Sequence, residues 1–470
     1  MPIAVESAPA PRTDPAAIPE CVRRVRHGFE SGKTRPIAWR LGQLERLRAL
    51  LVENGDALVE TLREDLGKPV LEAWAADIVG VAAEIKGFRK KLRRWMRPER
   101  VATPLEQRPA RARIVREPLG VVLIIAPWNY PLQLLFTPMV AAIGAGNGAV
   151  LKPSEVTAHT SALLAKLVPE YLDPDCIALV EGGVAETTAL LAERFDHIFY
   201  TGNGSVGRIV MEAAARHLTP VTLELGGKSP CIVDRDVDVA VAARRIAWGK
   251  FLNAGQTCIA PDYVLVHRER EAELVETLKQ TLDAWYGEAP RENPDFGRIV
   301  NDRHHQRLAA LLKDGEVVVG GECDASDRYV APTLLRNVRF DSALMREEIF
   351  GPILPILTVR DVDEAIDVVN RGPKPLALYV FSRDPGVEDA VVSRTSSGGV
   401  CVNATLWHLA NPNLPFGGVG ASGMGAYHGR HGFETFSHRK PVVRRSTRFD
   451  PRFAYPPYSR FKVWLLKRML

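Results

Sequence analysis

One cysteine of the chain stands in a context that suits nucleophilic chemistry. Cys258, in NAGQTCIAPDY, follows a helix predicted over residues 239–253 and precedes the strand DYVLVH. Gly255 can take the left-handed conformation that ends a helix, so Cys258 would lie on a turn, where functional residues often lie. A thiol becomes a good nucleophile when it ionises. The alternative, a small buried apolar residue, fits Cys231 and Cys401 in their apolar strands better.

Two further residues could take part in such chemistry. Glu224, in VTLELGGKSP, ends an apolar strand, and ligands commonly bind at the carboxyl edge of a parallel sheet. A carboxylate with a raised pKa there is a candidate general base, although a carboxylate that caps a loop is at least as common. Asn129, in PWNYP, could donate to an oxyanion, and an Asx turn that satisfies its own backbone is the competing interpretation.

Residues 201–207, TGNGSVG, contain the pattern G-x-G-x-x-G at Gly202, Gly204 and Gly207, with Ser205 inside it. The run follows the strand HIFY and precedes a helix, which is the context of a dinucleotide-binding turn. The rule that places an acidic residue about 20 residues further on would assign Glu224 to a ribose hydroxyl. That role competes with the role of a base, and the residues alone leave both open.

Strands and helices alternate on both sides of these residues, from 120 to about 226 and again from 227 to 420. Continuous apolar strands between helices are typical of parallel sheets covered on both faces. We therefore predict an α/β protein with two doubly wound parallel-sheet domains. The dinucleotide-binding domain would comprise residues 20–97 and 120–226, and the catalytic domain residues 227–420. Residues 98–119 would form an exposed hairpin outside both.

An uncharged stretch at 118–151 is long enough to span a bilayer, but Pro127, Pro131 and Pro138 interrupt it. It therefore predicts two buried strands and a helix instead. The first 19 residues lack the basic and apolar regions of a signal peptide, and we predict a disordered leader there.

The composition indicates a globular protein with a sizeable core, because 46% of the 470 residues are hydrophobic and 25% are charged. Disordered, collagenous and coiled-coil proteins are excluded. The six cysteines form no CxxC pair and no metal-ligand spacing, so thiols in a reducing, cytoplasmic compartment are expected, and no metal.

Seven short motifs follow one another along the chain: PWNYP, LKPSE, FYTGNGSVG, LELGGKSP, GQTC, EEIFGP and LPFGGVGASGMG. In their order and spacing, over roughly residues 20–445, they resemble the aldehyde dehydrogenase superfamily. GQTCIAPDY, GAYHGRHGFETFSHRKP and YPPYS are similar to the class 3 branch, which includes fatty-aldehyde and coniferyl-aldehyde enzymes. The resemblance implies the aldehyde dehydrogenase-like fold, with a small β appendage for oligomerisation.

The resemblance also implies catalytic roles. Cys258 would attack the aldehyde to form a thiohemiacetal, while the Asn129 amide and the backbone N–H of Cys258 would hold the oxyanion. Hydride transfer to a nicotinamide would leave a thioester, and water activated by Glu224 would hydrolyse it. For Glu224, the resemblance therefore favours catalysis over ribose binding. The expected substrate is a hydrophobic aldehyde, medium- or long-chain aliphatic or aromatic.

The cofactor implied by the resemblance is NAD or NADP. Glu155 could accept from a ribose 2′-hydroxyl, whereas Lys152 could receive a 2′-phosphate, so the choice between the two stays open. The positions that match the family's cofactor contacts are Lys152 and Glu155 at the adenosine ribose, Gly202, Gly204, Ser205 and Gly207 near the pyrophosphate, and Glu348 and Phe350 at the nicotinamide ribose.

Two other functions compete with hydrolytic aldehyde oxidation. In a CoA-acylating relative, the CoA thiol would take the acyl group, but such enzymes typically lack the base at the position of Glu224. A catalytically idle structural or binding member would not need the nucleophile, the oxyanion donor and the base together. The sequence also departs from class 3 relatives, at Asn203–Gly204 and over residues 404–418. In the family, residues 404–418 border the substrate tunnel, so the resemblance does not identify the particular aldehyde that this chain oxidises.

The net charge of +5 is unevenly distributed. Residues 89–116 and 439–470 each carry a net charge of +9, so the rest of the chain is acidic. In the family, the hairpin at 98–119 and a strand near 436–450 join one sheet that builds a homodimer. The tail, residues 455–470, pairs apolar with basic side chains and could lie on an anionic membrane or cover a neighbouring substrate tunnel. Nucleic acid is not an expected partner.

Overall fold

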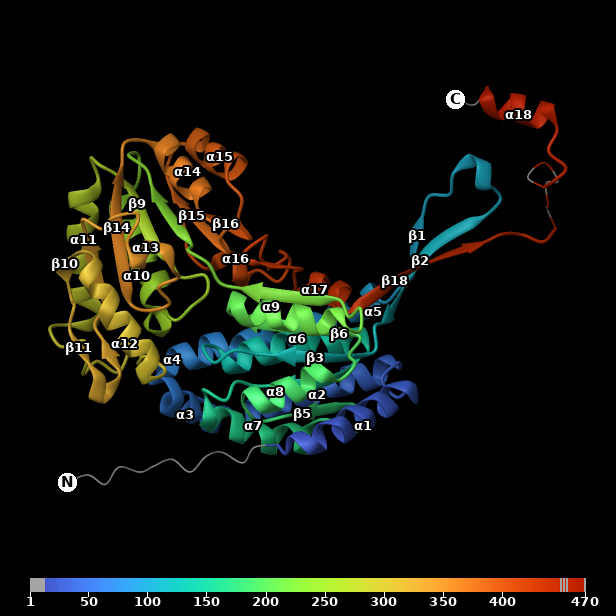
Figure 1. Ribbon diagram of the computed structural model, residues 1–470, viewed down its shortest axis with the longest axis horizontal. Coiled ribbons are helices and arrows are strands. Elements are labelled where there is room, and N and C mark those ends of the chain that lie inside the picture. The colour runs from blue at the N-terminus through green and yellow to red at the C-terminus, as the bar shows by residue number, and fades with distance from the viewer. Residues whose placement is uncertain (1–12, 449, 451–452, 454, 469–470) are drawn as a thin grey trace.

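The computed structural model describes residues 13–448, 450, 453 and 455–468. The ribbon forms two α/β lobes side by side and an arm that projects from one of them (Figure 1). Each lobe is built around its own sheet, and the arm has a third.

The sheet of the first lobe has the order β17-β7-β6-β3-β4-β5, in which β17 alone is antiparallel to its neighbour. Its strands are β3 (Val121–Ile125), β4 (Gly148–Lys152), β5 (Ile177–Leu179), β6 (His197–Gly202), β7 (Val221–Leu225) and β17 (Gly423–Met424).

Helices cover both faces of this sheet because its strands are apolar on both sides. Val121 and Leu123 of β3 pack with one buried cluster, and Val122 and Ile124 pack with another. The first cluster draws on α1 (Ile18–Glu30), α8 (Val184–Ala192) and α9 (Gly204–Ala215). The second draws on α2 (Ile37–Glu53), α3 (Gly55–Leu66), α5 (Gly80–Trp95), α6 (Pro131–Ala145) and α7 (Ala158–Tyr171).

The sheet of the second lobe has the order β10-β13-β14-β9-β8-β15-β16 and is parallel except for β10. Helices α10 and α11 pack on one face, and α14 and α15 on the other. The strands are β8 (Pro230–Val233), β9 (Tyr263–His267), β10 (Glu316–Val319), β13 (Thr333–Arg336), β14 (Ile353–Val359), β15 (Ala377–Phe381) and β16 (Gly399–Val402). The helices are α10 (Val239–Phe251), α11 (Glu271–Tyr286), α12 (Asp302–Leu311), α13 (Ala343–Arg346), α14 (Val362–Arg371), α15 (Pro385–Arg394), α16 (Trp407–Ala410) and α17 (Gly429–Thr435), the last lying against the first lobe.

These two mostly parallel sheets, each covered by helices on both faces, confirm the predicted α/β class. The apolar stretch 118–151 folds as strand, helix and strand. Among the described residues, no helix has both the length and the apolar character that crossing a bilayer requires.

The arm is a three-stranded antiparallel sheet of β1 (Glu99–Val101), β2 (Arg111–Pro118) and β18 (Ser437–Arg444). Eight residue pairs join β2 to β18, which brings the two basic segments of the chain together. Beyond the arm, the short helix α18 (Arg460–Lys467) stands apart from both lobes (Figure 1).

The structure differs from the predicted disordered leader over residues 13–19. Thr13 bonds with Glu181 through both its backbone N–H and its hydroxyl, and Asp14 caps the turn η1 (Pro15–Ala17). Ile18, fully buried, then begins α1. The apolar face of α1 therefore anchors a segment whose Pro- and Ala-rich composition suggested disorder. Residues 1–12 lie outside the described part of the chain.

Candidate active site

The order of the strands gathers the candidate site at the seam between the two lobes. In the first sheet, β4 and β5 extend from one side of β3, and β6 and β7 from the other, so the strand order reverses between β3 and β6. Ligands bind outside the carboxyl ends of strands at such a switch point. The segment after β3 contains Asn129, and the segment after β6 contains Ser205.

The second lobe completes the site with segments that precede its strands. The chain runs from β7 through Gly226 directly into β8. Because β8, β9 and β14 are parallel neighbours, the segments that lead into them lie at one edge of the sheet. Cys258 precedes β9, and Glu348 and Phe350 precede β14. Side chains separated by more than 200 residues are thereby brought to one place.

A cavity of about 860 Å³ lies at this seam. That volume is within the range of ligand pockets. Nine of the eleven residues singled out from the sequence line it: Cys258, Glu224, Asn129, Lys152, Glu155, Gly202, Ser205, Glu348 and Phe350. Gly204 and Gly207 are not among its lining residues.

Gly204 and Gly207 instead shape the helix that borders the cavity. Gly204 begins α9, and the side chain of Asn203 caps that helix by accepting from the N–H of Val206 at 2.9 Å. Gly207 is buried, and a Cβ atom there would lie 3.0 Å from a methyl group of Leu225. Gly207 therefore lets α9 approach β7 closely, with the helix N-terminus at the cavity.

Cys258 lies at the end of a strained turn. Helix α10 ends at Phe251, and Asn253, Ala254 and Gly255 all have positive φ. Gly255 must be glycine for a second reason, because a Cβ atom would lie 2.2 Å from the carbonyl oxygen of Gly351. Two non-glycine residues in this conformation cost free energy, which often indicates a functional site.

The thiol of Cys258 has a pKa well above that of an ordinary cysteine. Burial raises its pKa to about 12, and the nearby carboxyl groups of Glu348 and Glu224 act in the same direction. The backbone N–H groups of Cys258 and Ile259 oppose them. A cationic ligand beside the sulfur would lower this pKa.

Glu224 is a buried carboxyl group without a partner. It is the fourth residue of β7 and is 2% exposed, and neither of its oxygens accepts or donates a hydrogen bond among the described residues. Burial raises its pKa well above the ordinary value for Glu. A fold rarely leaves such a group unsatisfied, so Glu224 is available to a ligand or to water. It does not cap a loop.

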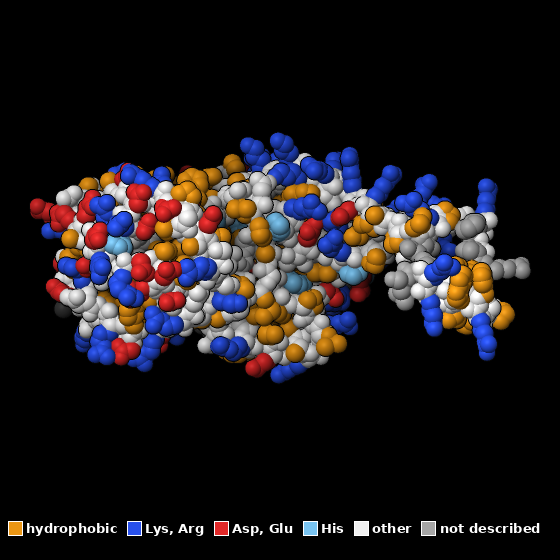
Figure 2. All heavy atoms as spheres, turned by 90° about the horizontal axis from the view of Figure 1, so that it is seen from above, with side chains coloured by type: hydrophobic (Ala, Val, Ile, Leu, Met, Phe, Trp, Pro, Cys, Tyr) orange, Lys and Arg blue, Asp and Glu red, His pale blue; other side chains and the backbone are white. Residues whose placement is uncertain are grey.

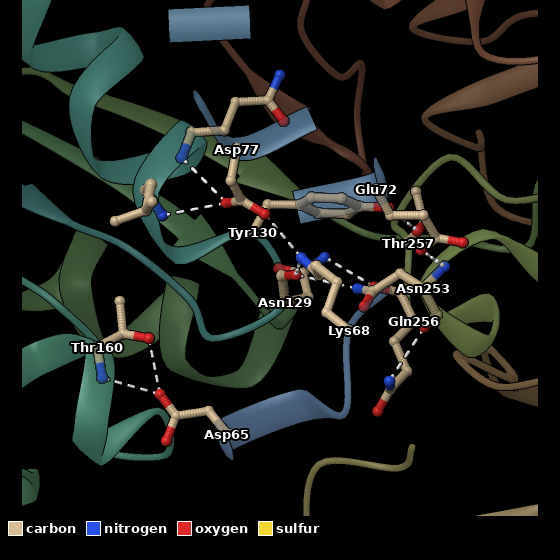
Figure 3. Close-up of polar contacts among 12 residues, drawn as sticks. Asp65, Lys68, Glu72, Asp77, Asn129, Tyr130, Thr160, Asn253, Gln256 and Thr257 are labelled. Atoms are coloured by element: carbon tan, nitrogen blue, oxygen red, sulfur yellow. Dashed lines mark hydrogen bonds and ion pairs between the residues drawn. The ribbon is translucent and has the colours of Figure 1, made fainter. Parts of the chain in front are cut away.

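Asn129 is held in a network that joins the two lobes (Figure 3). Its side-chain Nδ2 donates to the carbonyl oxygen of Gln256 at 3.0 Å, two residues before Cys258. Beside it, the hydroxyl groups of Tyr130 and Thr257 lie 2.6 Å apart. Asn129 does not form the self-contained Asx turn that the sequence allowed, because no backbone N–H among the described residues donates to its side-chain oxygen, and its Nδ2 is bonded across the seam.

The remaining polar groups fit a dinucleotide. Lys152 is buried with its Nζ 3.7 Å from Oε2 of Glu155, whose side chain is half exposed. Burial raises the pKa of Glu348 to about 8, although the N–H of Gly227 donates to it. A Cβ atom at Gly226 would lie 2.1 Å from Oε2 of Glu348, so only glycine leaves room for that carboxyl group. Two carboxyl groups, an ammonium group and the N-terminus of α9 thus line one cavity, and groups of these kinds can bind ribose hydroxyls and phosphate.

Sequence reasoning missed the aromatic and basic wall of the cavity. Trp128 packs its ring 5.4 Å from the rings of both Phe350 and His304. Arg307 donates to the backbone carbonyl oxygens of Glu348 and Ile349, which fixes the segment before β14. Neither His304 nor Arg307 belongs to a recognisable motif. Trp128 is part of the motif PWNYP, next to Asn129, and this position could have predicted that it lines the site.

A doubly wound sheet whose switch-point cavity contains a cysteine, a buried carboxyl group and an amide is typical of dinucleotide-dependent oxidoreductases that use a thiol. The model of the aldehyde dehydrogenase family matches residues 5–442. The chain therefore belongs to the aldehyde dehydrogenase family, and it is an NAD(P)-dependent aldehyde dehydrogenase, which oxidises an aldehyde to the carboxylic acid.

Individual relatives agree with this placement. The chain is 50% identical to aldehyde dehydrogenase family 3 member A2 of Mus musculus, over 94% of this chain and 92% of that protein. It is also 50% identical to the dimeric NADP-preferring aldehyde dehydrogenase of Rattus norvegicus, over 94% and 98%. Among solved structures, the substrate-bound AldH of Staphylococcus aureus superposes with a TM-score of 0.94 at 46% identity, covering 96% of this chain and 99% of that one. The class 3 resemblance is thereby confirmed.

Proposed function

We propose that the enzyme oxidises hydrophobic aldehydes through a covalent thioester on Cys258, which Glu224 then hydrolyses. The observation that carries this proposal is the shared cavity. The thiol, the unpartnered carboxyl group of Glu224 and the amide of Asn129 all line it, together with the groups that fit a dinucleotide.

The first step in this proposal is attack by the Cys258 thiolate on the aldehyde carbon, after the thiol proton has passed to water. The second N–H of the Asn129 amide, which is not used by Gln256, and the backbone N–H of Cys258 would stabilise the oxyanion. When bound, the oxidised nicotinamide cofactor supplies the acceptor for the hydride that leaves the substrate carbon. Cys258 then holds the acyl group as a thioester.

Glu224 would act in the second step, hydrolysis. Burial makes its carboxylate a stronger base than one in water, and both oxygens are free to orient a water molecule. The water loses a proton to Glu224 and adds to the thioester carbon, and the Cys258 sulfur leaves as the acid forms. The presence of a base favours water over the CoA thiol as the acyl acceptor.

The proposed hydrophobic substrate would lie toward the loop over residues 404–418. The hydroxyl of Tyr379 donates to the carbonyl oxygen of Ile259, next to Cys258, and the ring of His408 packs 6.1 Å from Tyr379. The loop is thereby linked to the nucleophile. It also exposes the apolar side chains of Trp407 and Leu414.

A substrate panel tests this function. Reduction of NAD or NADP is followed by absorbance with aldehydes of two to sixteen carbons and with substituted aromatic aldehydes. We expect kcat/KM to rise as the aldehyde becomes more hydrophobic. A preference for the shortest aldehydes would contradict the proposed substrate class, and no reduction with any aldehyde would favour an idle member of the family. Strict dependence of turnover on CoA would indicate the acylating alternative.

We also propose that the enzyme is a homodimer whose arms contribute to assembly. The relative from Rattus norvegicus is a dimeric enzyme. Here β18 is an edge strand of the arm, so its outer backbone groups are available to another chain. Light scattering should give about twice the mass of 51.8 kDa, and the monomer mass would contradict the proposal.

The tail is proposed to bind anionic membranes at their surface. Helix α18 exposes Phe461, Trp464 and Leu465 at helical spacing, while Lys467 and Arg468 follow at its end. Figure 2 shows basic and hydrophobic side chains gathered on the projecting arm and tail. Such a helix can lie in the membrane interface. This segment is part of residues 455–470, of which the last two lie outside the described residues.

Co-sedimentation with vesicles tests the tail. The full-length protein should sediment with vesicles that contain phosphatidylserine and less with pure phosphatidylcholine, and the attraction should weaken with salt. A chain that ends at Pro457 should stay in the supernatant in both cases. Equal binding of the two proteins would overturn the membrane role of the tail.

A further inference from the structure

We propose that Lys68 is a positioning residue, whose buried ammonium group holds the backbone of Asn129 so that the Asn129 amide reaches the oxyanion. This inference rests on the proposed oxyanion role of Asn129. Lys68 follows α3, in the sequence GKP, and is 61 residues distant from Asn129 along the chain. Nothing in its sequence context points to the site.

Lys68 is one of the largest fully buried side chains of the described protein. Its Nζ donates to Oδ2 of Asp77 at 2.7 Å and to the carbonyl oxygen of Asn129 at 2.8 Å. It also lies 4.2 Å from the centre of the Tyr130 ring. An ammonium group has three donors, and these three contacts surround it. The side chain therefore has one defined place, which Figure 3 shows between Asp77 and Asn129.

Asp77 also binds the helix that follows Asn129. Its second oxygen, Oδ1, accepts from the backbone N–H groups of Leu132 and Gln133 at 3.2 and 3.3 Å. These groups belong to the first turn of α6, where backbone N–H groups lack helical partners. The pair formed by Lys68 and Asp77 thus fixes both the carbonyl of Asn129 and the start of α6.

The other side of Asn129 is fixed by the segment that leads to Cys258. Nδ2 of Asn253 donates to the same carbonyl oxygen of Asn129 at 3.0 Å, and the amide of Asn129 donates to the carbonyl of Gln256. The backbone N–H of Asn253 is in turn bonded to Oε2 of Glu72 at 2.8 Å. Residues of both lobes therefore bind the backbone carbonyl of Asn129, and Lys68 is the cationic donor among them.

The energetics favour a positioning role over a stabilising one. Removal of two charges from water is expensive, and a buried ion pair is weak support for stability. Such a pair can instead restrict the groups that it binds to a single conformation. An oxyanion donor must be placed within a few tenths of an ångström, since a misplacement of about 1 Å can cost 100-fold in rate.

The variant Lys68→Met tests the inference by separating oxyanion formation from thiol reactivity. We expect kcat for aldehyde oxidation to fall between 10- and 100-fold, with less than a twofold change in KM. Alkylation of Cys258 by iodoacetamide forms no oxyanion, so its rate should change less than twofold. The control Lys33→Met removes a lysine that pairs with Asp173 and Asp175 away from the cavity and should change neither rate.

A double-mutant cycle with Asn129→Ala decides whether Lys68 acts through Asn129. In the Asn129→Ala background, Lys68→Met should cost less than a further twofold in kcat, because the group that it positions is gone. Losses that multiply in full, or a parallel loss in alkylation, would overturn the inference. If Asn129→Ala itself leaves kcat unchanged, the proposed function fails instead.

A second variant shows whether any loss of activity comes from misfolding around an unpaired, buried carboxylate. Lys68→Met leaves Asp77 buried and alone, whereas Lys68→Met/Asp77→Asn removes both charges and keeps an oxygen for α6. This double variant should show the same loss of kcat and the same unchanged alkylation. Wild-type kcat in a folded double variant would contradict the proposed role.

Discussion

Asn129 and Gln256 are joined by a hydrogen bond of 3.0 Å, from the side-chain amide of one to the backbone carbonyl of the other. Asn129 follows a strand of the first lobe, and Gln256 belongs to the turn that presents Cys258 in the second. The bond therefore sets the position of the proposed oxyanion donor relative to the proposed nucleophile. A change in the relative position of the two lobes would therefore change the position of the Asn129 amide relative to Cys258.

Replacement of the proposed base should separate hydride transfer from hydrolysis. In Glu224→Gln, we expect the first turnover to reduce cofactor in a burst, because Cys258 and Asn129 are intact. Steady turnover should fall by about 100-fold or more, since a general base typically contributes 10²–10⁴ in rate. Stopped-flow absorbance at the wavelength of the reduced cofactor measures both phases. Steady turnover at the wild-type rate would refute the assignment of Glu224.

The charge of Glu155 should govern the choice between the two cofactors. Its carboxylate lies beside Lys152 and would repel a 2′-phosphate. Glu155→Gln should therefore raise the ratio of kcat/KM for NADP to that for NAD by about tenfold, which corresponds to about 1.4 kcal/mol. Glu170→Gln, an exposed carboxylate on α7, is the control. An unchanged ratio in Glu155→Gln would remove Glu155 from the ribose site.

The close approach of Gly226 to Glu348 should make the glycine necessary for cofactor binding. A methyl group at position 226 would displace the buried carboxyl group of Glu348 from the bond with Gly227. In Gly226→Ala, KM for the cofactor should rise about tenfold or more. Gly42→Ala places its methyl group in open space on α2 and should leave KM unchanged. Isothermal titration with the cofactor offers a second readout, and wild-type affinity would argue against a role for Glu348.

Glu84 should make the stability of the fold depend on pH. Burial raises the pKa of Glu84 to about 7, although Oε1 accepts from the N–H of Gly429 at 2.6 Å. The folded state thus binds this proton more tightly than the unfolded state, so the contribution is complete below about pH 4 and is lost as the pH rises through 7.

In Glu84→Gln this proton is absent while the bond from Gly429 can remain. The free energy of unfolding of the variant, relative to wild type, should therefore increase by up to about 3 kcal/mol between pH 4.5 and pH 8. Urea unfolding followed by fluorescence at several pH values measures the difference. Parallel pH profiles for the two proteins would show that Glu84 has an ordinary pKa in the folded state.

The sequence predicted those parts of the site that local pattern determines. Cys258 and Glu224 stand at a turn and at a strand end, and the alternation of strands and helices places both at sheet edges. Gly207 was predicted at the cofactor, but in the structure it is buried against Leu225 and lines no part of the cavity. The pattern G-x-G-x-x-G identifies the turn and cannot say which glycine faces the ligand.

The contacts that hold the site could not be predicted, because they join residues far apart in the chain. Lys68 precedes Asn129 by 61 residues, and Asn253 follows it by 124. Each would ordinarily be taken as a solvent-exposed polar residue. Likewise, the structure of residues 13–19 depends on pairing with Glu181, which the composition of the leader does not reveal.

Intact-protein mass spectrometry of Glu224→Gln tests the covalent mechanism most directly. After incubation with oxidised cofactor and an aldehyde, followed by an acid quench, the protein should gain the mass of the acyl group. Peptide mapping should place that group on Cys258, and hydroxylamine should remove it as expected of a thioester. An unmodified chain after a burst of cofactor reduction, or an acyl group on another cysteine, would contradict the proposal that Cys258 carries the substrate.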